Sequence, residues 1–578
     1  MDRPLPFRHR VNEPTPAIVS QSAVRRLPRL ALLLLCLAYV LPGFIGREPW
    51  RTADMTAFGY MFALAGGQGS WLSPELLGQP PEFDALLPYW LGSWAIQAAP
   101  AGVAPDFAAR LPFVALLVLT LLAAWYAVYY LARSPRAQPV AFAFGGEASP
   151  TDYARAIADG ALLALIACLG LAQLAHETTP SLAQLGFTTL SFYALAALPY
   201  RTLAPAIALV LGLAGLALSG APAMAVLFAL GGVAINLLDP PPQEENAAPG
   251  KWRWAALVLL VALAVAVLAW SLELWRWRIG EAAVRDWRSI GRLLLWFTWP
   301  AWPLAIWTLW RWRRQLGSRH VALPLWFVAV AVGATVLTRS SDRSLLLSLP
   351  ALAALAAFAL PTLTRSVSAL IDWFTLLFFS AWALVIWVVW IAMQTGFPAK
   401  PAANVAKLAP GFEPSFSLVA FMAALVATAA WAWLVRWRTG RHRAAIWKSL
   451  VLPAGGAALC WLLLMTLWLP ALDYGRSYLP VVRDATQRID TPGCVETLGL
   501  DRGQMAALAF HGGLDLRLAA REASCPWLIV AGDIRASAPI ALLMDQWQLV
   551  SGIRRLADPH DTLILYRRAE AAAAAPDR

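Results

Sequence analysis

Long apolar runs separated by short polar connections occupy most of the chain between residues 29 and 469. A helix that crosses the hydrocarbon region of a bilayer needs about 20 mostly apolar residues. By this criterion the pattern predicts about 13 membrane-spanning helices. They are expected at 29–45, 109–131, 157–175, 181–198, 203–219, 222–238, 254–272, 293–310, 321–338, 345–360, 370–392, 417–435 and 449–469.

The pattern changes after residue 469, where short apolar pieces alternate with polar segments. Residues 526–532 (PWLIVAG) and 562–568 (TLILYRR) are typical of strands, whereas 502–511 (RGQMAALAFH) and 539–547 (PIALLMDQW) favour helices. The predicted fold class is therefore an all-α polytopic membrane protein with a small C-terminal α/β domain. We expect an N-terminal tail at 1–28, a transmembrane domain at 29–469 and the C-terminal domain at 470–578.

The connection between the first two predicted spans, 46–108, is long and only moderately polar. Its apolar pieces, about 56–66 and 86–98, are too short to cross a bilayer. Pieces of this length suit helices that lie in the membrane interface. We therefore expect this segment to form a layer at one end of the bundle.

Composition supports the membrane assignment. Hydrophobic residues make up 59% of the 578 residues and charged residues only 14%, and mean hydropathy is +0.58. Soluble domains carry about 25% charged residues. The net charge of +12 comes from lysines and arginines scattered over short loops, which argues against a nucleic-acid-binding surface and excludes nucleic acid as an expected partner.

The positions of lysine and arginine predict the orientation. Basic residues cluster in the N-terminal tail and then in alternate connections, the last of which holds Arg436, Arg438, Arg441, Arg443 and Lys448. Because basic loops stay in the cytoplasm, the N-terminus should be cytoplasmic and the C-terminal domain should lie outside. We therefore expect a multi-pass bacterial inner-membrane protein with a periplasmic C-terminal domain.

One connection on the predicted outer side, residues 273–292, breaks the charge rule. It carries five arginines: Arg276, Arg278, Arg285, Arg288 and Arg292. An amphipathic helix on the membrane surface would place them among lipid headgroups. The same arginines would also suit a phosphorylated lipid substrate. The two interpretations are compatible, and the sequence leaves both open.

Two acidic residues are expected at the outer face. Asp54 follows the first predicted span, and Glu177 follows the third, in the segment HETTP. Either carboxylate can be an ordinary charge at the end of a helix. A pair of carboxylates at one site can instead perform general acid–base chemistry.

Several segments, in order, resemble a known family. They are Trp50-Arg51 followed by Asp54, GSWLSPELLGQPPEFDALLPYWL (69–91), HETTP (176–180), GLALSGAPAM (215–224), TWPAWPLAIWTLWRWR (298–313), SSDRSLLLSLPALAAL (340–355) and LPALDYGRSY (469–478). This order resembles the lipid-linked sugar transferases of glycosyltransferase family 39 and the lipid A aminoarabinose transferases, within the GT-C superfamily. The resemblance covers most of the chain.

The resemblance implies an integral membrane glycosyltransferase that moves a sugar from a polyprenyl phosphate to a lipid, glycan or protein acceptor at the outer membrane face. Asp54 matches the position of the family's base, and Glu177 would orient the acceptor or help to hold a metal. The two carboxylates leave room for a divalent cation with oxygen ligands without establishing one. No metal ligand is assigned, and no cofactor is otherwise indicated.

The donor-phosphate ligands of the family differ here. Lysines expected beside LPYW and in the segment that reads LSGAP (218–222) are absent. Arginines are the replacements that the sequence offers, because a guanidinium binds phosphate with two parallel hydrogen bonds. The candidate substrate-binding residues are Arg51, Asp84, Tyr89, Arg285, Arg288, Arg339 and Arg343.

The missing lysines also leave a second hypothesis, in which the chain is a catalytically altered relative or a transporter or flippase of lipid-linked substrates. A transporter is expected to have ionisable residues or broken helices near the middle of the membrane. In this chain the charges concentrate at the ends of the predicted spans, which favours an interfacial site.

The five cysteines divide into two groups. Cys36, Cys168 and Cys460 lie in predicted spans and are expected to be small packing residues. Cys494 and Cys525 lie in the C-terminal domain, and a periplasmic location would allow them to form a disulfide.

Overall fold

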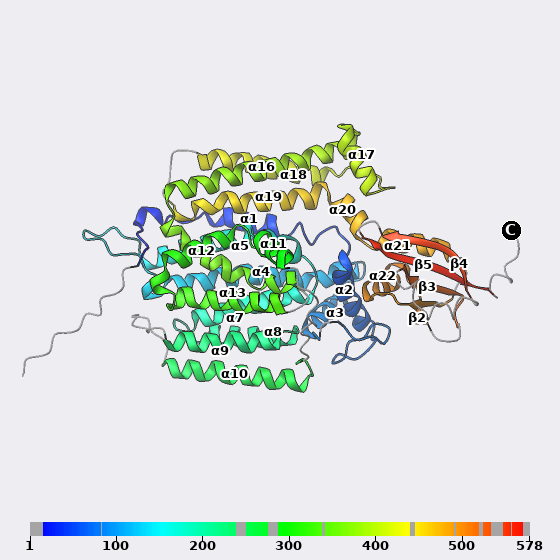
Figure 1. Ribbon diagram of the computed structural model, residues 1–578, viewed down its shortest axis with the longest axis horizontal. Helices are drawn as coiled ribbons and strands as arrows, with labels where there is room; N and C mark the ends of the chain where they lie inside the picture. Colours follow the sequence, from blue (N-terminus) through cyan, green and yellow to red (C-terminus); the bar gives the residue numbers. More distant parts are fainter. Residues whose placement is uncertain are drawn as a thin grey trace, which may run out of the picture.

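The computed structural model describes most of the chain. The described residues are 15–82, 84–238, 250–275, 287–337, 341–439, 445–490, 493–519, 524–532, 547–555 and 558–569. Figure 1 shows a bundle of roughly parallel helices, with the C-terminal sheet at one end of it. The fold class predicted from the sequence, a polytopic helical membrane protein with a small C-terminal α/β domain, is confirmed.

Helices α4 (Pro105–Ala132), α5 (Pro150–Ala167), α7 (Pro180–Ala197), α15 (Leu349–Ala359) and α19 (Val451–Leu467) form the centre of the bundle. α5 packs against both α4 and α15, and nearly all of its residues are buried. A helix that is apolar on every side is stable only when it is surrounded, which accounts for this central position.

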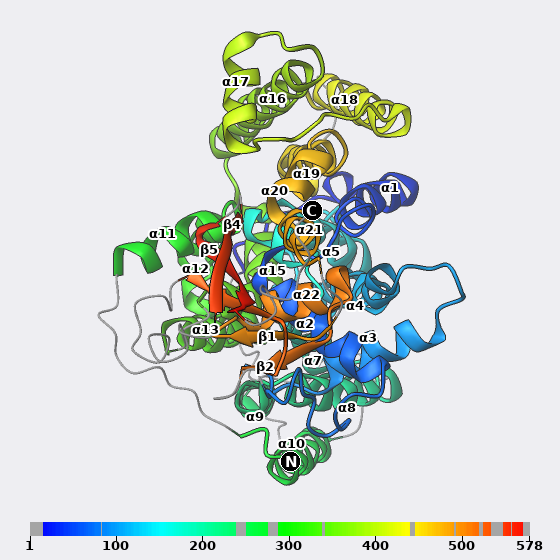
Figure 2. The same ribbon diagram turned by 90° about the vertical axis from the view of Figure 1, so that its right-hand side faces the viewer.

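The remaining helices of the bundle surround these five. They are α1 (Arg29–Val40), α6 (Leu169–Leu174), α8 (Leu203–Leu218), α9 (Pro222–Leu238), α10 (Lys251–Ser271), α11 (Trp287–Phe297), α12 (Ala301–Arg311), α13 (Arg319–Leu337), α14 (Ser341–Leu346), α16 (Arg365–Thr395), α17 (Ala399–Leu408) and α18 (Leu418–Thr439). α10, α16 and α18 expose leucine, tryptophan and phenylalanine side chains, as helices that face lipid do. In Figure 2, α16, α17 and α18 stand apart from the rest of the bundle.

Every predicted span contains helix, but two of them are broken. The run at 157–175 divides into α5 and α6 at Cys168, and the run at 293–310 divides into α11 and α12. The two breaks touch, because the backbone N–H of Leu169 donates to the carbonyl of Trp299 at 3.0 Å. Pro300, which has no N–H, prevents an unbroken helix there. Among the described residues, six stretches are long and apolar enough to span a membrane by themselves, in α4, α10, α13, α16, α18 and residues 446–467.

The two short apolar pieces of the first outer loop are also helical. α2 (Arg51–Ala65) and α3 (Leu87–Ala98) cover 56–66 and 86–98 almost completely, and they pack against each other at the end of the bundle. Figure 1 shows them on the side that faces the C-terminal sheet. Both pieces are therefore helical, and their position relative to the membrane stays a prediction.

The C-terminal part begins with α20 (Leu469–Arg476) and α21 (Leu479–Arg488). Its sheet has the order β2-β1-β3-β5-β4, formed by β1 (Val495–Leu498), β2 (Leu516–Leu518), β3 (Trp527–Ala531), β4 (Trp547–Arg555) and β5 (Asp558–Arg568). β1 is parallel to β2 and β3, whereas β5 is antiparallel to β3 and β4. The two predicted strands are β3 and β5. Most of the helix predicted at 539–547 lies outside the described residues, and its last residue, Trp547, begins β4.

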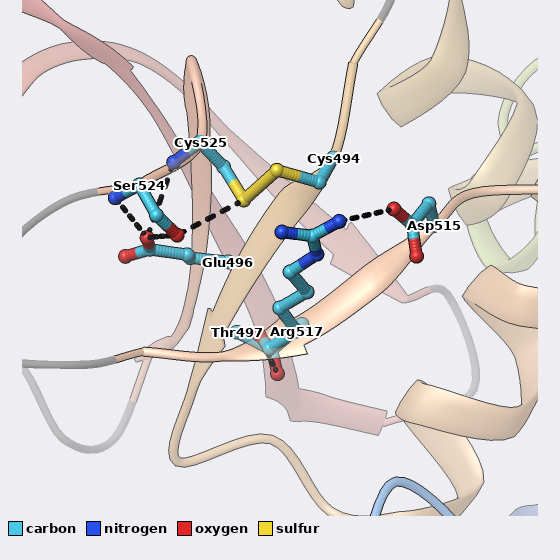
Figure 3. The surroundings of a disulfide bond; sticks show 7 residues. All are labelled: Cys494, Glu496, Thr497, Asp515, Arg517, Ser524 and Cys525. Atoms are coloured by element: carbon cyan, nitrogen blue, oxygen red, sulfur yellow. Dashed lines mark hydrogen bonds and ion pairs between the residues drawn. A yellow bond between two sulfur atoms is a disulfide. The ribbon is translucent and has the colours of Figure 1, made fainter.

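The predicted disulfide between Cys494 and Cys525 is present, with the two Cα atoms 5.2 Å apart. Figure 3 shows it beside Glu496, whose Oε1 accepts hydrogen bonds from the backbone N–H groups of Ser524 and Cys525 and from the Ser524 hydroxyl. The bridge thus joins the starts of neighbouring strands β1 and β3.

The C-terminal domain contacts the bundle through α22 (Arg502–Gly512), which lies against α2. Glycines allow the close approach. A methyl group added at Gly59 would lie 2.4 Å from Cβ of Ala506, and one at Gly503 would lie 2.9 Å from the carbonyl oxygen of Thr52. The helix that carries Asp54 is therefore held between the bundle and the C-terminal domain.

Candidate functional site

Asp54 lies in the first turn of α2, where the positive end of the helix dipole favours a carboxylate. The backbone N–H of Trp50, just before the helix, donates to Asp54 Oδ2 at 3.1 Å. This is the cap that an acidic residue in the first turn can provide locally. The spacing Trp50–Asp54 noted in the sequence therefore has a direct structural role.

Three further donors surround the same carboxylate. Arg47 Nη1 donates to Oδ2 at 2.9 Å, and Thr178 donates to Oδ1 from its backbone N–H at 2.8 Å and from its hydroxyl at 2.6 Å. The Asp54 side chain has an exposed fraction of 1%. A carboxylate has about four lone-pair positions, and here four donors occupy them. Asp54 thus joins the loop before α2 to the loop between α6 and α7.

These donors determine the charge of Asp54. Burial alone would raise the pKa of its carboxyl, but the Arg47 guanidinium and the bonds from Thr178 lower it by more, so that the pKa lies below its ordinary value. Asp54 is therefore ionised at neutral pH.

Glu177, the neighbour of Thr178, is also buried, with a side-chain exposure of 3%. Its Oε2 lies 3.6 Å from Nη2 of Arg343, and Gln173 Nε2 donates to its Oε1 at 3.5 Å. Both distances exceed the 2.7–2.9 Å of a strong charge-assisted hydrogen bond. These two contacts of Glu177 are therefore longer than the hydrogen bonds to Asp54.

The Arg343 side chain is 17% exposed and projects from α14. α14 contacts α6, α7 and α11, so that it lies over the loop that contains Glu177. α11 carries Arg288, which is exposed. The structure therefore brings Arg343 to Glu177 and places Arg288 on a neighbouring helix.

The other predicted binding residues have different surroundings. Tyr89 is buried and packs against Tyr60 of α2, with ring centroids 5.4 Å apart. Tyr60 lies six residues after Asp54, which is about 9 Å of helix rise along α2. Tyr89 is a packing residue of the α2–α3 pair. Arg285 and Arg339 lie outside the described residues, and of Arg51 only the backbone, at the start of α2, is described.

Asp84 lies near the second segment that lacks a family lysine. Two residues later, the backbone N–H of Leu86 donates to the carbonyl of Leu218 at 2.8 Å. Gly220 has a φ of +87°, and a methyl group added there would lie 3.2 Å from the Asp84 carbonyl oxygen. The segments PPEFDALLPYW and LSGAP are therefore adjacent, and a side chain at Gly220 is disfavoured by both backbone conformation and space.

Sequence reasoning missed several residues of the site. Arg47 donates to the carbonyls of Gly43 and His176 as well as to Asp54. Asp473 accepts hydrogen bonds from the Trp50 indole at 2.7 Å and from the Glu48 backbone at 2.9 Å. The guanidinium groups of Arg47 and Arg476 lie 5.0 and 5.5 Å from the Trp50 ring. Asp473 and Arg476 belong to the matched segment LPALDYGRSY, which was the available signal.

The residues around Asp54 do not suit a divalent cation. Its oxygens face N–H and O–H donors and a guanidinium, whereas a hard cation needs several oxygen ligands. Within the described residues, no group of three or more His, Cys, Asp or Glu side chains is placed to hold a metal ion. The site as built is an arrangement of two carboxylates and arginines.

Neither a protein-family model nor a curated protein matches this sequence. Two solved structures match its fold, and both are crystal structures of ArnT from Cupriavidus metallidurans, one bound to undecaprenyl phosphate and one in the apo state. Each has a TM-score of 0.61 at 14% sequence identity, and the match covers 95% of this chain and 99% of that chain. The chain therefore has the same overall fold as these ArnT structures.

Proposed function

We propose that this protein is an integral membrane glycosyltransferase that moves a sugar from a polyprenyl-phosphate donor to a lipid, glycan or protein acceptor. The reaction would take place at the periplasmic face of the inner membrane, at the end of the bundle where α2 and α3 pack together. The observation that carries the proposal is the pair of buried carboxylates, Asp54 and Glu177, joined through Thr178 and accompanied by Arg343.

The chemistry requires few groups. The acceptor oxygen attacks the anomeric carbon of the sugar, a carboxylate takes the proton of the acceptor, and the bond between that carbon and the phosphate oxygen breaks. Its electron pair leaves on the lipid phosphate. A phosphate is a good leaving group, so that the protein needs a base and cations rather than a strong acid. Glu177 and Arg343 supply these two kinds of group.

The fold supports the choice of donor. The ArnT structure with the same fold was solved with undecaprenyl phosphate, a polyprenyl phosphate. A lipid-linked donor reaches an interfacial site by diffusion within the membrane, and its phosphate would meet the arginines at the end of the bundle. Among the described helices, charges gather at the ends of the bundle, which disfavours the transporter hypothesis.

The test is transfer of sugar from a pool of polyprenyl-phosphate donors to lipid and glycan acceptors by the purified protein. Asp54→Ala and Glu177→Ala are compared with the wild type. Asp484→Asn is the matched control, because Asp484 is exposed on α21 and only pairs with Arg488 on the same helix. We expect transfer by the wild type and the control, and loss of transfer in both alanine variants. Absence of transfer by the wild type from every donor would refute the proposal.

A further inference from the structure

The Asp54 carboxylate has no lone pair left for a substrate hydroxyl. Asp54 already accepts four hydrogen bonds, from Arg47, Trp50 and Thr178, and its side chain has almost no exposed surface. A general base must offer a lone pair to the hydroxyl group that it deprotonates. An acceptor hydroxyl could reach Asp54 only by displacing one of those donors. The geometry therefore gives Asp54 a positioning function.

What Asp54 positions is the adjacent acidic residue. Its bonds to the backbone N–H and the hydroxyl of Thr178 fix the peptide that follows Glu177. Arg47 holds the peptide that precedes Glu177, since it donates to the carbonyl of His176. The backbone on both sides of Glu177 is thus held by the Asp54–Arg47 pair, and α7 begins three residues later at Pro180.

Arg343 can pair either with the Glu177 carboxylate or with a phosphate. Its contact with Glu177 is long, at 3.6 Å, and its side chain is more exposed than that of Glu177. The donor is a phosphodiester with one negative charge. Once the sugar has been transferred, the polyprenyl phosphate that leaves is a monoester with up to two negative charges. A guanidinium binds such an anion with two hydrogen bonds. The attraction of Arg343 to phosphate therefore increases as the sugar is transferred.

We propose that Glu177 is the general base, that Arg343 pairs with it until the donor phosphate binds, and that Asp54 only positions it. Binding of the phosphate by Arg343 releases the Glu177 carboxylate toward the acceptor. Glu177 then takes the acceptor proton while the acceptor oxygen bonds to the anomeric carbon. The bond from this carbon to the phosphate oxygen breaks, and its electrons remain on the phosphate beside Arg343.

This assignment rests on the proposed function, but it makes a binding prediction of its own. If Glu177 competes with phosphate for Arg343, removal of its charge should tighten phosphate binding while it abolishes turnover. An ordinary binding residue would show the opposite pattern, because its loss weakens binding. An increase in phosphate affinity would therefore show that Glu177 competes with the phosphate for Arg343, and a decrease would show that Glu177 binds the phosphate group's surroundings as an ordinary binding residue does.

The experiment measures binding of undecaprenyl phosphate to the detergent-solubilised full chain, together with steady-state transfer. The variants are Glu177→Gln, Arg343→Gln and Asp54→Asn. Arg313→Gln is the matched arginine control, because α13 separates residue 313 from α14 and its 19 residues extend about 28 Å. Thermal unfolding of each variant identifies those that are not folded.

We expect Glu177→Gln to bind undecaprenyl phosphate about threefold more tightly or better, while kcat falls by at least about a hundredfold, the range of a lost general base. Arg343→Gln should bind it about tenfold more weakly. Asp54→Asn should lower kcat but retain the acidic limb of the pH–rate profile at its wild-type position, because that limb reports Glu177. Arg313→Gln should match the wild type.

Three outcomes overturn the assignment while transfer by the wild type still supports the proposed function. The first is weaker or unchanged binding in folded Glu177→Gln, and the second is retention of more than a tenth of kcat in that variant. The third is loss of the acidic limb in Asp54→Asn, which would make Asp54 the base. A wild type that neither transfers sugar nor binds undecaprenyl phosphate would instead refute the proposed function itself.

Discussion

Thr178 donates both its backbone N–H and its hydroxyl to one oxygen of Asp54, at 2.8 and 2.6 Å. The two residues are 124 positions apart in the sequence. This double contact joins α2 to the loop between α6 and α7. It fixes the relative position of the two carboxylates on which the proposed reaction depends.

Loss of the Thr178 hydroxyl should therefore disturb the site without removing a charge. Thr178→Val keeps the side-chain shape but leaves Asp54 Oδ1 with one donor fewer in a buried place. We expect a loss of about 1–3 kcal/mol in unfolding free energy. We also expect a fall in transfer rate on the order of 10- to 100-fold, because Glu177 is displaced. Both are measured on the purified protein, by thermal unfolding and by transfer assay.

Thr178→Ser is the matched control for this change, since it keeps the hydroxyl and loses only a methyl group. It should retain most of the activity. Equal activity in the valine and serine variants would contradict a structural function for the hydroxyl bond.

The contact between α2 and α22 provides a second test, because Gly59, which has no side chain, allows the two helices to approach closely. In Gly59→Ala the new methyl group would lie 2.4 Å from Cβ of Ala506, which is too close. We expect a loss of about 1–3 kcal/mol in stability, the usual cost of overpacking. Activity should also fall, because α2 carries Asp54. The second change Ala506→Gly removes the opposing methyl group, and it should restore most of both quantities.

Gly333→Ala in α13 is the control, since no atom lies within 4 Å of the added methyl group. It should leave stability unchanged or slightly higher, as alanine favours a helix. If Ala506→Gly fails to rescue Gly59→Ala, close packing of the two helices is not the reason for the loss.

The sequence was sufficient for some of these features and insufficient for others. Apolar run length predicted where helices occur, since burial in lipid requires about 20 apolar residues. It did not predict that the third and eighth runs break, because the breaks are stabilised by a contact between them, from Leu169 to Trp299. That contact joins residues far apart in the sequence, and the local pattern of apolar residues carries no information about such a contact.

The same limit applies to the site. Asp54 and Glu177 were identifiable as acidic residues at the ends of apolar runs, and the structure places them in adjoining loops. Arg47 was not identified, because nothing in its local sequence distinguishes it from other arginines near a membrane end. Its importance arises because it joins Asp54 on α2 to the carbonyl of His176, which is 129 positions away in the sequence. The motif gave no indication that the Tyr89 ring is buried against Tyr60, and its predicted part in substrate binding stays a prediction.

The disulfide between Cys494 and Cys525 should contribute to the stability of the C-terminal domain. The two residues are 31 positions apart. Closing a loop of that length lowers the entropy of the unfolded chain, which stabilises the folded state by about 3–4 kcal/mol at 25 °C. The double variant Cys494→Ser/Cys525→Ser should therefore unfold at a lower temperature and be cut sooner by protease within 470–578. A reducing agent should reproduce the loss in the wild type and have no further effect on the double variant. Unchanged protease resistance after reduction would contradict this contribution.

Glu48 should make stability depend on pH. Burial, together with the nearby charges of Asp106 and Asp473, raises the pKa of its carboxyl from 4.5 to about 6. The folded protein thus binds this proton more tightly than the unfolded chain does. The stabilising contribution is complete below pH 4.5 and is lost as the pH rises through about 6.

His511, 3.8 Å from Glu48, acts in the opposite direction. Burial lowers its pKa from 6.5 to about 4, so that its contribution to stability is present above 6.5 and is lost as the pH falls through 4. The two dependences overlap between pH 4.5 and about 6, where they partly cancel in the wild type. Glu48→Gln removes only the first of them. We therefore expect the midpoint of thermal unfolding, measured at intervals from pH 4 to 7.5, to rise more steeply with pH in Glu48→Gln than in the wild type. Parallel curves for the two proteins would mean that the Glu48 carboxyl titrates alike in the folded and unfolded chains.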